Sequence, residues 1–204
     1  MNQRLLRLAI GTLIGLGIAA GIVWWQISSL PTGSSSGTQT GTALIGGPFS
    51  LTDQTGRPVT DADYRGHYLL IYFGYTYCPD VCPTELQVMS AALDQLGPKG
   101  DQVQPVFITI DPERDTASQL AEYVAQFHPR MAGLTGTPEQ IAAAARAYRV
   151  YYSKAPGKAG DGYYTMDHSS FVYLMGPDGR FLEAFAHGTT ADQMAQAIRN
   201  RLKS

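Results

Sequence analysis

Cysteine is scarce in this 204-residue chain: only Cys78 and Cys82 occur, four positions apart. A small protein stapled by disulfides would carry more cysteines, spread along its length. Lysine and arginine form no cluster, and the formal net charge is −2. A nucleic-acid-binding protein needs a basic surface that neutralises phosphates, so we expect no nucleic-acid partner. The two cysteines therefore indicate a chemical site and not a covalent framework.

Charge is also missing near the start of the chain, where residues 8–25 form an uncharged, mostly apolar run that ends in two tryptophans. Its length approaches the roughly 20 residues that span a bilayer core. Arg4 and Arg7 precede the run, which places the N-terminus in the cytoplasm by the positive-inside rule and the tryptophans at the outer interface. We expect residues 1–27 to be a retained membrane anchor. The alternative is a cleaved signal peptide, whose apolar region is usually only about 7–15 residues.

A polar segment follows the apolar run. Residues 28–44 consist largely of glycine, serine and threonine, which is typical of a flexible linker with little to bury. Residues 45–204 are long enough for one domain. We therefore expect a single-pass protein of the inner cell membrane, with this domain facing the periplasm.

An α/β pattern begins after the linker. Residues 68–73 and 103–110 are continuous apolar runs, typical of strands buried on both faces of a sheet. Helical segments alternate with these strands, and the cysteine motif directly follows the first of them. We expect an α/β thioredoxin-like fold with an N-terminal hairpin, preceded by a single transmembrane helix. The expected order is a hairpin at 49–59, a strand at 68–73, a helix at 83–96, a strand at 103–110, two helices, a short strand at 148–152, a hairpin at 171–184 and a last helix.

Three of these helices open with the same sequence signal. In a Thr-x-x-Gln capping box, the threonine and glutamine side chains each bond the other residue's backbone N–H. The three expected pairs are Thr116 with Gln119, Thr137 with Gln140, and Thr190 with Gln193.

The two cysteines lie in the segment Cys78-Pro79-Asp80-Val81-Cys82-Pro83. Pro83 suits the first helical position, and a residue before proline is biased away from the helix, so we expect Cys82 to precede it. The helix N-terminus favours the thiolate, which attacks disulfides and binds metals. The redox pair of thioredoxins is Cys-x-x-Cys. The extra residue here opens the turn and leaves room for an ion between the sulfurs.

Two thiolates alone make an incomplete metal site, so a nitrogen donor is expected. His168 precedes the strand at 171–175, and in a thioredoxin-like sheet the segment entering that strand faces the cysteine turn. We therefore expect His168 to be a metal ligand. The other histidines are expected to be structural or solvated: His67 at the far end of the first core strand, His128 at a helix end where a cation suits the dipole, and His187 in the loop before the last helix.

Three segments resemble the Sco/SenC family of copper-binding proteins. They are Gly-Tyr-Thr-Tyr-Cys-Pro-Asp-Val-Cys-Pro at 74–83, Asp-Pro-Glu-Arg-Asp-Thr at 111–116 and Asp-His-Ser-Ser at 167–170, in the order and spacing of that family. The resemblance covers about residues 45–203 and includes the N-terminal anchor. It implies a thioredoxin-like domain that binds one copper ion through Cys78, Cys82 and His168.

The resemblance also implies a function. Such proteins help to assemble the dinuclear copper A centre in subunit II of cytochrome c oxidase, so the expected partners are that subunit, a copper donor and an upstream thiol reductant. The donor set agrees with copper, because soft thiolates select Cu(I) and an imidazole also suits Cu(II). Zinc takes the same donors and is the obvious competitor.

Two other functions remain open. One is a thiol–disulfide oxidoreductase that uses Cys78 and Cys82 as a redox-active pair to reduce the cysteines of a copper acceptor. The other is a peroxidase-like or redox-signalling protein of the same fold. Disulfide exchange does not need His168, and thioredoxin-type enzymes usually place a cis-proline before the following strand, whereas residues 157–176 contain no proline. We therefore expect a metallochaperone first, with enzymatic activity undecided.

Several residues near the motifs have open roles. Asp80 lies between the thiols and is a candidate for tuning their charge, and Asp167 is a candidate for orienting His168. Both aspartates equally suit turn stabilisation. Residues 111–115 suit either a partner-docking loop or a plain strand-to-helix connection. Tyr77 stands where many relatives carry another residue, often histidine, and receives no role.

Overall fold

The computed structural model describes residues 21, 24–25, 45–156 and 164–202. Contacts divide the chain into two units, residues 1–42 and residues 43–204. The predicted anchor and linker lie almost wholly outside the described residues. Among the residues that are described, no helix has the length and apolar character needed to cross a membrane.

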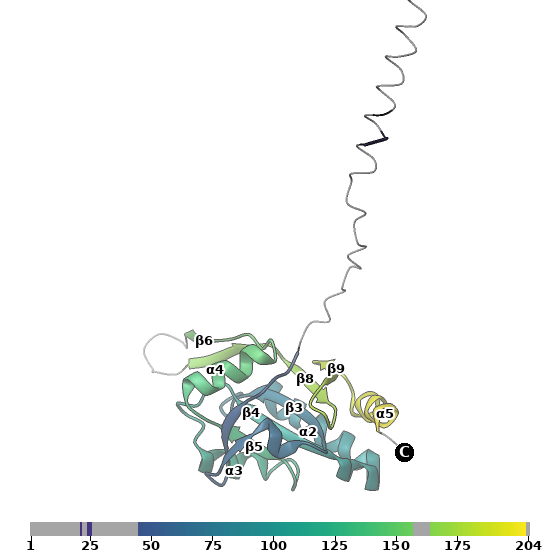
Figure 1. Cartoon of the computed structure of the whole chain (residues 1–204). Helices are drawn as coiled ribbons and strands as arrows, with labels where there is room; N and C mark the ends of the chain where they lie inside the picture. Colours follow the sequence, from purple (N-terminus) through teal and green to yellow (C-terminus); the bar gives the residue numbers. More distant parts are fainter. Residues whose placement is uncertain (1–20, 22–23, 26–44, 157–163, 203–204) are drawn as a thin grey trace, which may run out of the picture. The chain divides into compact units, whose positions relative to one another are not determined.

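The second unit contains two sheets and four α-helices in the described ranges (Figure 1). The strands are β1 (Ser50–Asp53), β2 (Pro58–Thr60), β3 (Tyr68–Gly74), β4 (Val103–Thr109), β5 (Ala132–Thr135), β6 (Tyr152–Pro156), β7 (Tyr164–His168), β8 (Phe171–Met175) and β9 (Phe181–Ala186). The α-helices are α2 (Val81–Leu96), α3 (Ala117–Val124), α4 (Pro138–Ala147) and α5 (Ala191–Arg201), with short 3-10 helices at Asp61–Tyr64 and Gly97–Gln102.

The larger sheet has the strand order β2-β1-β5-β4-β3-β8-β9. Its centre is the parallel pair β3 and β4, in register from Tyr68 opposite Val103 to Gly74 opposite Thr109. Strand β8 pairs antiparallel with β3 on the other side. The two long apolar runs are thus the central strands, and every residue of β3 is buried. The predicted α/β fold, with its N-terminal hairpin and antiparallel C-terminal pair, is confirmed.

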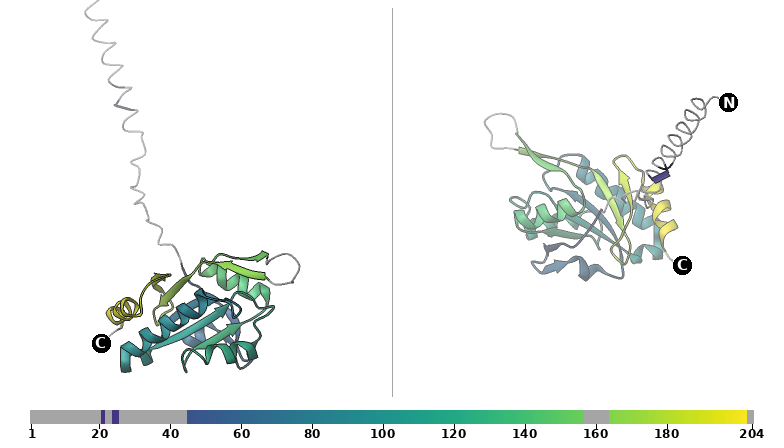
Figure 2. Two further views of the ribbon diagram at one scale, coloured as in Figure 1. Left: turned by 180° about the vertical axis from the view of Figure 1, so that it is seen from behind. Right: turned by 45° about the horizontal axis from the view of Figure 1, so that its top comes forward.

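Helices cover both faces of this sheet. Helices α2 and α5 pack on each other over one face, as the view from behind shows (Figure 2). Helix α4 lies over the opposite face (Figure 1). Aromatic contacts join the helices to β3 and β4, with Tyr123 of α3 against Phe107 and Tyr148, just after α4, against Phe73. The cysteine segment and His168 therefore lie at the edge of the sheet where β3 and β4 end and β8 begins.

The three predicted capping boxes are confirmed. In each, the threonine side chain accepts a hydrogen bond from the glutamine backbone N–H, and the glutamine side chain returns to the threonine backbone. These signals are local in sequence, so they mark helix starts whatever the tertiary fold.

The strand predicted at 148–152 is displaced. Arg149 has a φ of 58°, a left-handed conformation that a strand does not accommodate. Strand β6 therefore begins only at Tyr152, and it pairs with β7 in a separate two-stranded sheet. Strand β7 was not predicted. Strand β5 was also missed, because Ala-Gly-Leu-Thr is short and contains few residues that favour strands.

Candidate metal centre

The Cys78–Cys82 segment turns from the end of β3 into the first turn of α2. Cys82 is buried as the second helical residue, whereas Cys78 is half-buried before the helix. The prediction that Cys82 precedes the helix is wrong, since α2 begins at Val81. Pro83 is tolerated in the first turn because N–H groups there have no partner within the helix. The backbone N–H of Cys82 instead donates to the Cys78 Sγ at 3.3 Å.

The two sulfurs have opposite proton affinities. A hydrogen bond from the Cys82 side chain lowers the pKa of Cys78 far below the usual thiol value, with His168 and backbone N–H groups adding to this against the opposing effect of burial. The same hydrogen bond, together with burial, raises the pKa of Cys82. One proton is thus held on Cys82 while Cys78, the more exposed sulfur, is the thiolate.

His168 is the last residue of β7, and its imidazole lies against the cysteine turn. Its Nε2 is 3.6 Å from the Cys82 Sγ, and its Nδ1 is 3.0 Å from the Ser169 backbone oxygen. A carbonyl oxygen only accepts, so Nδ1 carries a proton, and Nε2 is the ring nitrogen that faces the sulfurs. Two donors bound to one metal at about 2.0–2.3 Å lie about 3.5 Å apart, which matches this separation.

The structure therefore brings Cys78, Cys82 and His168 together, as predicted from their positions. The residue suggested to orient the imidazole is different: the Ser169 carbonyl oxygen holds Nδ1, while Asp167 is exposed. Asp80, the N-cap residue of α2, is also exposed and makes no side-chain capping hydrogen bond. Within the described ranges, no group of three or more His, Cys, Asp or Glu side chains is already placed so that it could hold a metal ion. Metal binding would thus require a side-chain adjustment.

Tyr72 on β3 is a site residue that the sequence analysis missed. Its hydroxyl donates to the Cys82 Sγ at 3.8 Å and lies 3.1 Å from the Ser170 Oγ. Burial is the main cause that raises its pKa, so the hydroxyl remains protonated. The available signal was a tyrosine inside a fully apolar run, because a buried hydroxyl needs a partner. Gly74 ends the same strand, where an added Cβ would lie 2.9 Å from the Cys82 Sγ.

Asp115 fixes the loop that leads into the cysteines. Its buried carboxylate accepts hydrogen bonds from the Thr76 backbone N–H at 3.0 Å and from the Thr76 and Thr109 hydroxyls, each at 2.6 Å. Burial raises the pKa of Asp115, although these hydrogen bonds oppose the shift. Asp111 is buried too and accepts from the Tyr164 hydroxyl at 2.9 Å. Both aspartates of the 111–115 segment therefore face inward, while Glu113 is exposed, and the two inward aspartates favour a scaffold over a partner-docking loop.

Of the four histidines, all described, only His168 has a hydrogen-bonding contact with a cysteine sulfur. His67 is exposed before β3, at the end of the strand far from the cysteines. His187 Nδ1 is 2.6 Å from the carboxylate of Glu85, a buried residue of α2. Helix α3 ends at Val124, so His128 does not close a helix as predicted but lies in the loop that follows. It is buried, and burial lowers its pKa, so it is neutral and not the cation expected there. The expectation that His128 has a structural role nevertheless agrees with its burial.

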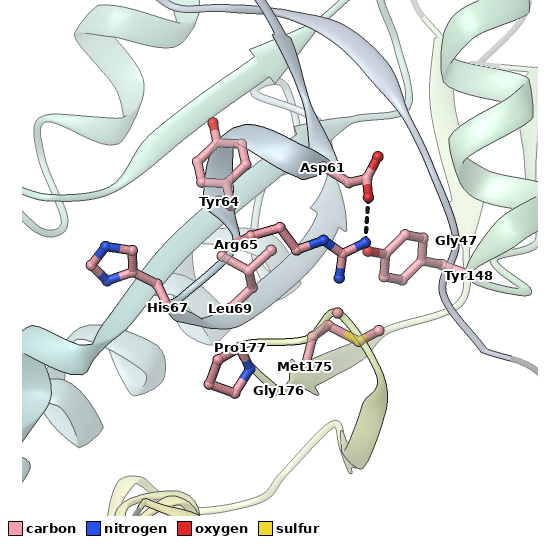
Figure 3. A pocket seen from close by; sticks show the side chains of 11 residues that line it. Gly47, Asp61, Tyr64, Arg65, His67, Leu69, Tyr148, Met175, Gly176 and Pro177 are labelled. Atoms are coloured by element: carbon pink, nitrogen blue, oxygen red, sulfur yellow. Dashed lines mark hydrogen bonds and ion pairs between the residues drawn. The ribbon is translucent and has the colours of Figure 1, made fainter.

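An open cavity of about 390 Å³ lies beside the half-buried sulfur and the imidazole, lined also by Tyr75, Pro79 and Met166. A second hollow lies at the opposite end of β3, where Arg65 pairs with Asp61 (Figure 3). That hollow has room for about 10 Å³ only, enough for no more than a single water molecule. The chemistry and the larger cavity thus coincide at the cysteine end of the sheet.

The fold and the site define a class of protein: a thioredoxin-like domain with two thiols and one imidazole beside an open cavity. Residues 37–203 match the SCO1/SenC family, so the chain belongs to that family. It is 48% identical over 165 residues to the human Protein SCO1 homolog, mitochondrial, covering 80% of this chain and 54% of that protein. Across the first curated relatives, the chain spans between 54% and 64% of their length.

Solved structures agree with this assignment. Bradyrhizobium japonicum ScoI with copper bound matches with a TM-score of 0.71 and 47% identity, over 78% of this chain and 99% of that chain. BsSco, a member of the Sco family of cytochrome c oxidase assembly proteins in which a disulfide switch was identified, matches with a TM-score of 0.60. It covers 77% of this chain and 92% of that chain, and at 24% identity it supports the fold alone.

Proposed function

We propose that this protein is a copper metallochaperone that binds one copper ion through Cys78, Cys82 and His168. Its proposed recipient is the dinuclear copper A centre in subunit II of cytochrome c oxidase. The observation that carries the proposal is the 3.6 Å approach of the His168 Nε2 to the Cys82 Sγ at the edge of an open cavity. Copper bound to a relative of 47% identity supports the choice of metal.

The chemistry of the donors fits delivery of the metal. Cys78 offers a partly exposed thiolate for first contact, and Cys82 then gives up its proton when it binds. His168 supplies a nitrogen whose tautomer the Ser169 carbonyl already sets. Two thiolates suit Cu(I), and the imidazole extends the site to Cu(II). A site of three protein donors beside an open cavity leaves a position for a ligand of the recipient.

A second candidate is a thiol–disulfide oxidoreductase, and the proton asymmetry of the two sulfurs favours it. The Cys78 thiolate would attack a partner disulfide, which releases one partner thiolate and forms a mixed disulfide. Cys82, after losing its proton, would attack the Cys78 sulfur and release the second partner thiol. The products are a reduced partner and a Cys78–Cys82 disulfide, which an upstream reductant must reopen. The same protein can perform both functions in succession.

The His168→Ala variant separates the two functions. Loss of one donor in three should weaken copper retention strongly, above all for Cu(II), whereas disulfide exchange does not need the imidazole directly. We expect His168→Ala to keep the Cys78–Cys82 redox couple and to lose oxidase maturation under limiting copper. The Cys78→Ser variant is the control that should lose both. If His168→Ala still matures the oxidase under limiting copper, the metallochaperone proposal is wrong and the oxidoreductase takes its place.

We also propose that residues 1–27 anchor the protein in the inner cell membrane and that residues 28–44 link this anchor to the domain of residues 45–204 on the periplasmic side. The support is the uncharged run at 8–25 and the arginines before it. N-terminal sequencing of the mature protein tests this proposal. A start near residue 30 would show cleavage and contradict the anchor.

A further inference from the structure

A single guanidinium joins three segments around the metal centre. Arg114 pairs through Nε with the buried Asp111 carboxylate, and its Nη1 donates to the Tyr164 backbone oxygen at 3.0 Å. Its central carbon lies 3.7 Å from the centre of the Tyr164 ring and 4.7 Å from that of Tyr77. These partners belong to the loop after β4, to the first residue of β7 and to the loop that precedes Cys78.

The contacts require an arginine. The Arg114 side chain is only 17% exposed, and its Nη2 is buried without a hydrogen-bond partner. The ring faces of Tyr77 and Tyr164 lie against the guanidinium. Their cation–π attraction stabilises the charge, although Nη2 has no hydrogen-bond partner. A planar guanidinium can stack and donate in two fixed directions at once, which the point charge of a lysine cannot do.

The segment held by Arg114 is the one that carries the imidazole. Strands β6 and β7 pair only with each other in the described structure, and a two-stranded hairpin alone is marginally stable. Arg114 and Asp111 hold the Tyr164 end of β7 through hydrogen bonds, and Met166 in the middle of the strand is buried in the core. His168 ends the same strand. The position of the imidazole relative to the sulfurs therefore depends on how this hairpin is attached.

We propose that Arg114 is a positioning residue of the metal centre: it holds the β7 strand with His168 and the loop with Cys78 at the separation that a shared metal ion needs. The proposal rests on the proposed function, because it assumes that these residues bind copper. Arg114 does not touch the metal and acts through Tyr164 and Tyr77. Loss of such outer partners typically costs about 10–100-fold in metal affinity.

The test compares Arg114→Met and Arg114→Lys with a matched control, Arg130→Met, in the reduced full-length protein. Arg130 also donates to two backbone oxygens, those of Gly100 and Val103, but at the opposite end of β4. We expect Arg114→Met to bind Cu(I) about 10–100-fold more weakly in chelator competition and to change the nitrogen hyperfine pattern of bound Cu(II). The Cu(I) affinity of Arg114→Lys should lie between those of the wild type and Arg114→Met, since lysine keeps the charge beside Asp111. Arg130→Met should keep the wild-type Cu(I) affinity and Cu(II) spectrum.

Two outcomes of the copper measurements would overturn the proposal. One is a folded Arg114→Met variant with wild-type copper affinity and spectrum. The other is an equal loss in Arg130→Met at the same melting temperature, which would indicate general destabilisation. Amide hydrogen exchange of the metal-free protein gives a readout without copper: exchange at Met166 should accelerate in Arg114→Met and not in Arg130→Met, and unchanged exchange contradicts the proposal. Failure of the proposed function is separate, because it appears as wild-type copper binding in Cys78→Ser or His168→Ala.

Discussion

The two cysteine side chains differ in protonation because their surroundings in the fold differ. Cys78 and Cys82 are the same residue four positions apart, yet one is a half-buried thiolate and the other a buried thiol. The difference follows from one hydrogen bond between them and from the greater burial of Cys82. The ionised sulfur is thus the one that a partner or a metal ion reaches first.

His128 shows the same dependence on environment and leads to a pH prediction. Burial lowers its pKa, Arg130 lowers it further, and its Nδ1 accepts a hydrogen bond from the Arg130 backbone N–H at 3.1 Å. A lowered folded pKa means that the unfolded chain binds the proton more readily. The stabilising contribution is therefore complete above the unfolded pKa of about 6.5 and declines as the pH falls through the folded pKa.

Replacement of His128 by asparagine should remove this pH dependence, because the amide oxygen can still accept from Arg130 but does not titrate. We expect the stability of the wild type, relative to His128→Asn, to fall between pH 7.5 and pH 5. Urea unfolding of both proteins across this range measures the difference. A difference that stays constant or grows as the pH falls would show that His128 is not held neutral in the fold.

At the scale of elements, helix starts depend on local signals and the attachment of strands does not. The capping boxes of α3, α4 and α5 each lie within four residues and need no distant partner. The β6–β7 hairpin, by contrast, depends on Arg114, Asp111 and the pairing of Lys154 with Glu113 at 2.7 Å. The strand that carries the imidazole is thus attached to the rest of the domain by contacts with the 111–114 segment, which is distant in sequence.

The cap of α4 offers a test of this local character. Thr137→Ala removes the oxygen that accepts from the Gln140 N–H, and we expect a loss of about 1 kcal/mol in the free energy of unfolding. Thr137→Ser keeps an accepting hydroxyl and should lose much less. Because α4 covers the face of the sheet away from α2, copper affinity should be unchanged in both variants. Equal stability of the two variants would contradict a capping role.

At the scale of the whole molecule, the sheet places its working parts at one end. Parallel β3 and β4 end beside each other, and β8 begins there after His168. The loops after β3 and β4 supply Cys78 and Asp115 at this edge. Because these loops leave the central strands, a metal ion bound at the site should also stabilise β3 and β4 against unfolding.

This coupling predicts a thermal shift on metal binding. A ligand at 100 times its dissociation constant stabilises a folded protein by about 2.7 kcal/mol. For a domain of this size that corresponds to an increase of about 5–10 °C in Tm, and to less if the unfolded thiols also bind copper. Calorimetry of the reduced protein with and without Cu(I) measures it, and a chelator should reverse it. An equal increase in Cys78→Ser would mean that the stabilising copper binds elsewhere.

Much of the fold could be read from short-range patterns in the chain. The central strands, the capping boxes and the turn with two cysteines each depend on residues that are neighbours in sequence. Even the meeting of His168 with the sulfurs followed from its place before a strand of a recognisable fold. Helix α2 already departs from this, because it starts at Val81 and not at Pro83: the sulfur of Cys78 takes the N–H that the helix leaves free.

Only the tertiary structure decided which distant side chains support the site. Asp115 meets Thr76 across 39 positions, Arg114 meets Tyr164 across 50, and Tyr72 meets Ser170 across 98. No periodicity or local propensity encodes such pairings, because they arise when separate strands end at the same edge of a sheet. The neutral state of His128 belongs to this group as well. Its expected place at a helix end suggested a charged imidazole, but it lies in a loop after α3, and burial in the folded domain lowers its pKa.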